Sequence, residues 1–141
     1  MAAGMYALAN LAQRSIREVD RFRAEVTMPD KEDLCDEAVD LFADDKFDEA
    51  IELYKKALEL DPKFADAAQG LALCYKGKGD LDSAIEVTNQ YVKQEPEDIL
   101  AFTNLSMFYQ QKGMIKEAET AGAEARRLDW KRQLKEGKPK A

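Results

Sequence analysis

The sequence predicts an all-α protein, a solenoid of stacked antiparallel helix pairs. Apolar side chains recur every three or four residues, the spacing of amphipathic helices. Pro62 and Pro96 lie 34 residues apart, and similar blocks repeat at this interval as far as Trp130. A repeat of this length indicates a two-helix unit that cannot bury its apolar face alone, so we expect the units to stack.

The 34-residue period divides the chain into three units and two flanks. The units are 31–64, 65–98 and 99–132, preceded by residues 1–30 and followed by a basic C-terminal tail, 133–141. A chain of 141 residues is long enough for one domain with one modest core.

Small and large side chains recur at equivalent places in the units. Small residues, which let helices approach closely, stand at Ala38, Ala72 and Ser106 and at Ala50, Ala84 and Ala118. Large residues that can fill the spaces between them stand at Leu41, Tyr75 and Tyr109 and at Phe47, Leu81 and Ile115. This alternation predicts a packed seam along the stack.

Short turns separate the two helices expected in each unit. Residues 43–46, 76–79 and 111–113 interrupt the helical spacing, and the second and third of these turns contain glycine, which suits a left-handed helix cap. Pro62 and Pro96 then end the second helix of the first two units. Because the turns are short, each unit is predicted to be an antiparallel hairpin.

The run AVDLFADDKFDEAIELYKKALELDP, residues 38–62, closely resembles the greater part of a tetratricopeptide repeat. The other two units resemble it more loosely, and the resemblance extends over residues 31 to about 132. It implies a tetratricopeptide-type α-solenoid with flanking helices. The chain departs from the family at Glu37, where leucine is usual, at Asp45, where glycine is usual, and at Trp130, which ends the third unit.

The segment before the first unit reads as one additional helix that ends near Pro29. Its apolar face consists of Leu8, Ala12, Ile16, Val19 and Phe22. Two roles are open for this helix: it caps the end of the stack, as terminal helices of solenoids commonly do, or it docks on a partner or a second protomer. Its arginines are balanced by acidic residues, which disfavours a membrane surface.

The resemblance further implies that the first helices of the units line a concave groove that binds a partner. Four residues per unit are expected to face this groove: Glu32, Cys35, Val39 and Phe42, then Asp66, Gln69, Leu73 and Lys76, then Leu100, Thr103, Met107 and Gln110. Val39, Leu73 and Met107 occupy equivalent places and form an apolar stripe that suits an apolar or amphipathic peptide. The alternative is that the N-terminal helix or the C-terminal segment fills the groove.

A chaperone-type clamp for an acidic C-terminal peptide is not expected. That clamp uses lysine and asparagine in the first helices, whereas Cys35 and Val39 stand at those places in the first unit and Leu100 replaces a lysine in the third. Lys76 and Asn104 are the remaining polar candidates.

Composition argues against several classes of function. The net charge of −7 disfavours nucleic acid as a partner, and no apolar run is long enough to span a membrane. The chain contains no histidine and no phosphate-binding glycine loop, so we expect no enzyme, no cofactor and no metal site. The two cysteines form no C-x-x-C pair, which fits a reducing, cytoplasmic location.

Two functional hypotheses follow from the sequence. The first is a protein–protein interaction module, a scaffold, adaptor or assembly factor that binds a peptide or helix of a partner in the groove. The alternative is a structural subunit or self-assembling solenoid that uses its end faces and its N-terminal helix. Net charges of −7 for residues 31–64 and +2 for residues 99–132 would favour head-to-tail oligomerisation.

Overall fold

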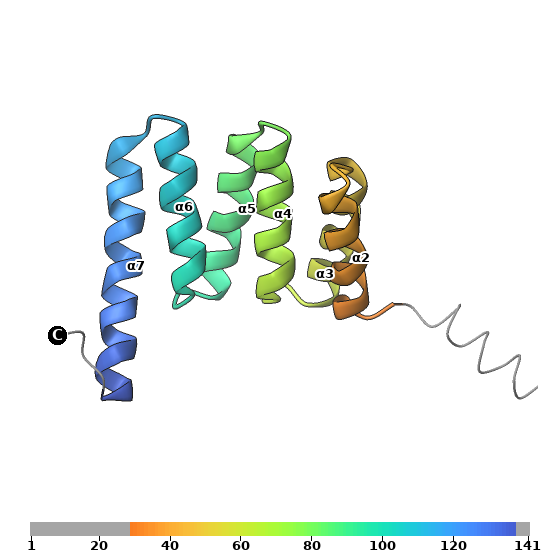
Figure 1. Cartoon of the computed structure of the whole chain (residues 1–141). Helices are drawn as coiled ribbons and strands as arrows, with labels where there is room; N and C mark the ends of the chain where they lie inside the picture. Colours follow the sequence, from red (N-terminus) through yellow and green to blue (C-terminus); the bar gives the residue numbers. More distant parts are fainter. Residues whose placement is uncertain (1–28, 138–141) are drawn as a thin grey trace, which may run out of the picture.

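The structure is a computed structural model that describes residues 29–137, and all regular structure in this range is helical. The helices are α2 (Lys31–Ala43), α3 (Phe47–Leu60), α4 (Ala65–Gly77), α5 (Leu81–Gln94), α6 (Ile99–Gln111) and α7 (Ile115–Glu136). They form three antiparallel hairpins that stand side by side in one row (Figure 1). Each helix packs on the next one along the chain, and α2 also contacts α4. The predicted all-α solenoid is confirmed.

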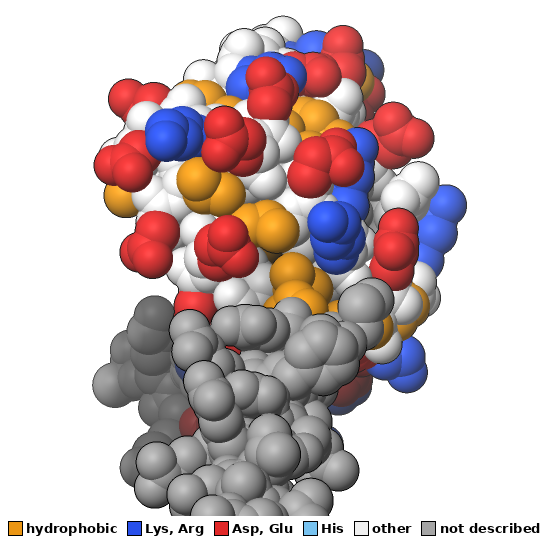
Figure 2. Space-filling model, turned by 90° about the vertical axis from the view of Figure 1, so that its right-hand side faces the viewer, with side chains coloured by type: hydrophobic (Ala, Val, Ile, Leu, Met, Phe, Trp, Pro, Cys, Tyr) orange, Lys and Arg blue, Asp and Glu red, His pale blue; other side chains and the backbone are white. Residues whose placement is uncertain are grey.

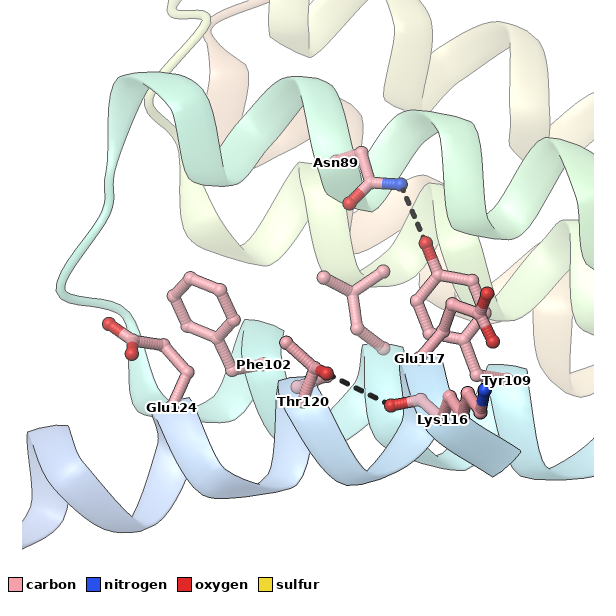
Figure 3. A pocket seen from close by; sticks show the side chains of 9 residues that line it. Asn89, Phe102, Tyr109, Lys116, Glu117, Thr120 and Glu124 are labelled. Atoms are coloured by element: carbon pink, nitrogen blue, oxygen red, sulfur yellow. Dashed lines mark hydrogen bonds between the residues drawn. The ribbon is translucent and has the colours of Figure 1, made fainter. Parts of the chain in front are cut away.

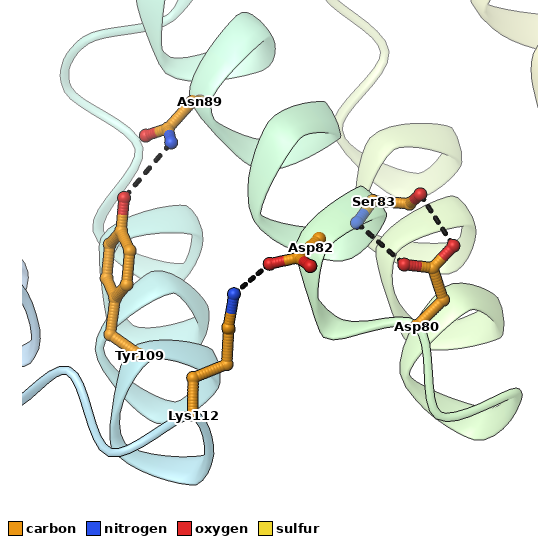
Figure 4. Close-up of polar contacts among 6 residues, drawn as sticks. All are labelled: Asp80, Asp82, Ser83, Asn89, Tyr109 and Lys112. Carbon is orange, nitrogen blue, oxygen red and sulfur yellow. Dashed lines mark hydrogen bonds and ion pairs between the residues drawn. The ribbon is translucent and has the colours of Figure 1, made fainter.

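Aspartates cap several helix starts. The carboxylate of Asp30 accepts a hydrogen bond from the backbone N–H of Asp33 at 2.8 Å. The carboxylate of Asp80 accepts from both the backbone N–H and the hydroxyl of Ser83, at 3.0 and 2.6 Å (Figure 4). Such caps satisfy N–H groups that have no partner within the helix, so they fix where the helix begins.

The hairpin turns use left-handed backbone conformations. Gly79 and Gly113 have φ angles of 82° and 78°, which confirms the expected glycine caps. Asp45, at the turn of the first unit, has a φ of 58°. This conformation costs about 1 kcal/mol for a residue with a Cβ, so the first turn is the strained member of the three.

The core lies between the helices and repeats from unit to unit. Small residues are almost completely buried where helices meet: Ala38, Ala50, Ala72, Ala84 and Ala118. The larger side chains of Ile51, Tyr54, Leu71, Leu105 and Phe108 fill the space around them. Each such side chain contributes about 1.5–3 kcal/mol by leaving water, so the stack depends on contacts between units.

Ion pairs also repeat at the junctions between units. Lys78, at the end of α4, pairs with Asp48 of α3, and Lys112 pairs with Asp82 one period later (Figure 4). Both aspartates are exposed, so each pair contributes little to stability. Their recurrence shows that the second and third units dock on their predecessors in the same register.

The last helix is longer than the sequence predicted. α3 and α5 have 14 residues and end just before Pro62 and Pro96, whereas α7 has 22 residues and ends at Gly137, which has a φ of 69°. Trp130 stands where the earlier units have proline, and nothing at that position removes a backbone donor. Residues 133–136 of the predicted tail therefore belong to α7, which continues past residue 132, the expected end of the third unit.

The predicted N-terminal helix, including its apolar face Leu8, Ala12, Ile16, Val19 and Phe22, lies outside the described residues. Residues 138–141 of the predicted tail lie outside them as well. Within 29–137, no helix is both long enough and apolar enough to cross a membrane.

Candidate partner-binding surface

The residues predicted to face a groove lie on α2, α4 and α6, the first helix of each hairpin. We call this surface the first-helix face. Lys76 of α4 and Met107 of α6 meet across it, with the ammonium nitrogen 3.8 Å from the thioether sulfur. Leu73 and Met107 pack on the same buried cluster, around Leu105 and Phe108. Lys76 and Leu73 of the second unit therefore lie close to Met107 of the third.

The apolar stripe is accessible to solvent. Val39 is 54% exposed, whereas Leu73 and Met107 are partly buried. Leu100, near the start of α6, is 50% exposed. Large apolar side chains left open on this face, Val39 and Leu100, indicate a contact surface, because such exposure is unfavourable unless a partner covers it.

Two predicted residues lie differently from the expectation. Cys35 is buried, with 6% exposure, and packs among Leu34, Ala38 and other core residues, so it does not line an open surface. Phe42 is partly buried, and its ring stacks edge-on against Phe47 of α3 at 5.4 Å between centroids. Both residues support the first-helix face from below.

The remaining predicted residues are polar. Glu32, Asp66, Thr103 and Gln110 are exposed, and Gln69 is partly buried. The hydroxyl of Thr103 donates to the backbone carbonyl of Ile99 at 3.0 Å. Its donor is thus used within its own helix, which leaves the hydroxyl oxygen as an acceptor.

Negative charge gathers at one end of this face. Burial, and to a lesser extent the carboxylates of Asp66, Asp36 and Glu32, raise the pKa of the Cys35 thiol to about 11 by disfavouring the thiolate. Glu32 and Asp36 lie one turn apart on α2, Asp66 lies in the first turn of α4, which contacts α2, and all three are exposed; we call them the acidic cluster. Sequence reasoning missed Asp36, although its place one helical turn after Glu32 was a usable signal.

The end of the stack formed by α2 and α3 is also rich in acidic side chains. In Figure 2, which views the molecule from that end, acidic side chains lie around hydrophobic ones, with several Lys or Arg side chains among them. This matches the net charge of −7 for the first unit.

A second recess, not anticipated from the sequence, lies between α5, α6 and α7 (Figure 3). It encloses about 520 Å³, and its residues are Asn89, Phe102, Leu105, Tyr109, Lys116, Glu117, Thr120, Ala121 and Glu124. The amide of Asn89 donates to the hydroxyl of Tyr109 at 3.2 Å across its top. The polar rim and apolar floor resemble those of a side-chain pocket.

The period explains why this recess is large. The equivalent space one unit earlier, between α3, α4 and α5, measures about 150 Å³ and is lined in part by Val87. Ala121 stands at the equivalent position of the third unit, so the smaller side chain leaves room. The change from valine at position 87 to alanine at the equivalent position 121 is the sequence signal that could have revealed this recess.

Reactive groups are scarce on the described surfaces. Burial raises the pKa of Cys74 to about 11, as it does for Cys35, so neither thiol is an activated nucleophile. No group of three or more potential metal ligands occurs between residues 29 and 137. The apolar and polar side chains of the first-helix face are therefore suited to contact with a partner.

Comparison with known proteins identifies related sequences and folds. A family model described as tetratricopeptide repeat matches residues 41–106. Among curated proteins, the probable UDP-N-acetylglucosamine–peptide N-acetylglucosaminyltransferase SPINDLY of Hordeum vulgare is 28% identical over 106 residues. This match covers 75% of the present chain but only 11% of the barley protein.

Solved structures with a similar fold include MamA and a bacterial secretion chaperone. The crystal structure of MamA has a TM-score of 0.72 and 26% identity, with 92% of this chain and 75% of that chain covered. SycD of Yersinia enterocolitica, a type III secretion chaperone in complex with a peptide of the translocator YopD, has a TM-score of 0.64 and 23% identity. There, 69% of this chain and 74% of that chain are covered.

Proposed function

We propose that this chain is a tetratricopeptide-repeat interaction module that holds a peptide or helix of a partner protein on its first-helix face. The observation that supports this most is the apolar stripe. Val39, Leu73 and Met107 occupy one equivalent place in the three units, where Val39 is exposed and Leu73 and Met107 are partly buried against the core. The partner's apolar side chains would cover this stripe.

Relatives support a binding role in general terms. SycD, which shares the fold, was solved with a peptide of another protein bound. We do not assign the transferase activity of SPINDLY to this chain, because the match covers only 11% of that protein. A scaffold, adaptor or assembly factor in the cytoplasm is the specific role we propose for the module.

Substitution of two exposed apolar residues of the first-helix face, Val39 in the stripe and Leu100 beside it, tests this proposal. Val39→Glu and Leu100→Glu place a charge where the partner's apolar side chains would sit, and both sites are half exposed, so the fold should tolerate the changes. Leu60→Glu is the matched control, since Leu60 is 55% exposed on α3, away from the first-helix face.

Capture from an extract of the native source, followed by mass spectrometry, is the readout. We expect the Val39→Glu and Leu100→Glu variants to lose the proteins that the unchanged chain and the Leu60→Glu control retain. Circular dichroism should show the same helical content for all three variants. Equal capture by all of them would reject the first-helix face as the binding surface.

The alternative is a head-to-tail assembly through the end faces of the stack. The residues on the exposed side of α7 disfavour it. Positions that hold Ile51 and Ile85 against the next unit in the first two hairpins hold Glu119 in the third. Arg126 is likewise charged where the earlier units have leucine and valine, and both residues are exposed. A further unit docking there would bury two charges. Light scattering across ionic strength tests the alternative, which predicts a mass that falls as salt is added.

A further inference from the structure

We propose that the partner segment is a basic amphipathic helix, whose apolar side chains cover the apolar stripe and whose lysines or arginines face the acidic cluster. This inference rests on the function proposed above and specifies the chemistry of the partner. It follows from the positions of the charged groups on the first-helix face relative to the stripe.

The acidic cluster forms no ion pair within the described part of the chain. Ion pairs there engage Asp48, Asp61, Asp82, Glu97, Glu124 and Asp129. Glu32, Asp36 and Asp66 make none of these pairs, and all three are exposed. Lys31 is the nearest lysine in sequence, but its ammonium group is bonded to Asp61 at 2.6 Å. Within residues 29–137 no ion pair neutralises the cluster, although Lys31 interacts electrostatically with Glu32, and the remaining negative charge attracts cations.

The spacing between the cluster and the stripe suits a helix lying across the units. Glu32 precedes Val39 by seven residues on α2, and Asp66 precedes Leu73 by seven on α4, which is about 10 Å along each helix. A partner helix laid on the stripe has a radius of about 5 Å with side chains, and a lysine or arginine on its flank reaches several ångströms further. Its basic flank would thus meet the carboxylates while its apolar face stays on the stripe.

The opposite edge of the stripe contains a lysine on α4. Lys76 lies ten residues after Asp66 on α4, and its ammonium group contacts Met107 at 3.8 Å. One edge of the first-helix face is therefore acidic and the other contains a lysine. A partner helix with basic residues along one flank only can place them against the acidic cluster and away from Lys76. The charges at the two edges therefore determine which flank of the partner helix faces the cluster.

An acidic partner would be disfavoured on the same surface. Its carboxylates would face the three carboxylates of the acidic cluster, and like charges at close range are repulsive. The inferred partner is thus opposite in charge to the acidic C-terminal peptides that a carboxylate clamp binds.

Binding of designed peptides to the full chain tests this inference by fluorescence anisotropy. The probe is a labelled 16-residue peptide with leucines at helical spacing and lysines along one flank. One comparison peptide has glutamates in place of the lysines, and the other has the composition of the probe in an order without helical periodicity. We expect the probe to bind at least about tenfold more tightly than either, because both apolar and charged contacts must be matched.

Charge reversal in the protein identifies the site. Asp36→Lys with Asp66→Lys should weaken binding of the probe about tenfold, since each exposed pair changes Kd by about threefold. Glu52→Lys with Glu59→Lys is the matched control, because it makes the same change of net charge at two exposed residues of α3. The control pair should change Kd less than about twofold at physiological salt.

Each outcome decides between the two proposals. Equal binding of the acidic peptide, or equal weakening by both pairs of substitutions, would overturn the basic partner. If Val39→Glu weakens every peptide while reversal of Asp36 and Asp66 changes nothing, the first-helix face still binds but the charge inference fails. If Val39→Glu leaves every peptide unaffected, the proposed function itself fails.

Discussion

Replacement of Gly70 by alanine should destabilise the protein, although alanine is the better helix former. Gly70 lies inside α4, and a Cβ built on it would be 2.2 Å from Cζ and 2.4 Å from Cε1 of Tyr54. Carbon atoms in contact are about 3.5 Å apart, so the overlap is more than 1 Å. Tyr54 is 4% exposed among Ile51, Leu71 and other core residues, and its ring has no solvent to move into.

The net effect is the difference between two contributions. Alanine gains about 1 kcal/mol over glycine inside a helix. Overpacking of a closed core costs about 1–3 kcal/mol, and an overlap of this size against a buried ring belongs at the upper end. We therefore expect the free energy of unfolding to fall by about 2 kcal/mol. Urea denaturation followed by circular dichroism measures this difference.

Gly122→Ala is the matched control. Gly122 also lies inside a helix, α7, but the nearest atoms to an added Cβ are Oγ of Ser106 at 3.2 Å and a guanidinium nitrogen of Arg126 at 3.4 Å. The Ser106 hydroxyl donates to the backbone carbonyl of Ala118 at 2.8 Å, but the contact needs only a few tenths of an ångström of movement, so the variant should be as stable as the unchanged chain or up to about 1 kcal/mol more stable.

A double substitution identifies Tyr54 as the cause. In a Tyr54→Leu background the ring that an alanine at position 70 meets is gone, so Gly70→Ala should cost nothing further there. If Gly70→Ala proves as stable as Gly122→Ala, or remains equally destabilising after Tyr54→Leu, the expected role of Tyr54 is refuted. The close packing of Tyr54 of α3 on Gly70 of α4 would then not be the reason that position 70 requires glycine.

Three further predictions concern the turns, the caps and the thiols. Asp45→Gly should raise the free energy of unfolding by up to about 1 kcal/mol in urea titrations, because glycine adopts the φ of 58° without strain. Hydrogen bonds from the hydroxyl and the backbone N–H of Ser83 hold the pKa of Asp80 below its ordinary value of 3.8. The cap therefore stabilises the fold above about pH 4 and ceases to do so as pH falls through the lowered pKa, so the gap in urea midpoint between the unchanged chain and Asp80→Ala should be present at pH 7 and shrink toward pH 2. Because burial raises the pKa of both Cys35 and Cys74 to about 11, N-ethylmaleimide at pH 8 should modify them about a hundredfold more slowly in the native protein than in urea.

The junction between the second and third units differs from the first. Tyr54 packs on Gly70 between the first two units, but Thr88 and Asn104 occupy the equivalent places at the next junction. Thr88 is buried, and its hydroxyl donates to the backbone carbonyl of Ala84 at 2.8 Å. The second junction thus replaces an aromatic contact with a smaller side chain, and the larger recess of Figure 3 lies beside it.

The candidate surface was only partly predictable from the sequence. Residues spaced by 34 must fall on equivalent faces of equivalent helices, so the apolar stripe could be predicted without coordinates. The burial of individual residues could not be predicted from the sequence. Cys35 lies at the same helical position as the more accessible Gln69 and Thr103, and it is buried only because neighbouring side chains close over it in the structure. The acidic cluster needed the same information, since Asp36 and Asp66 belong to different units.

The sequence alone determined the unit, its two helices, its turns and its repetition, because apolar spacing, glycine and proline act on the backbone locally. Only the tertiary structure decided how far α7 extends, how much space remains beside Ala121, and which carboxylates share a surface. These properties depend on side chains from helices far apart in the sequence, and their packing together is a property of the assembled stack.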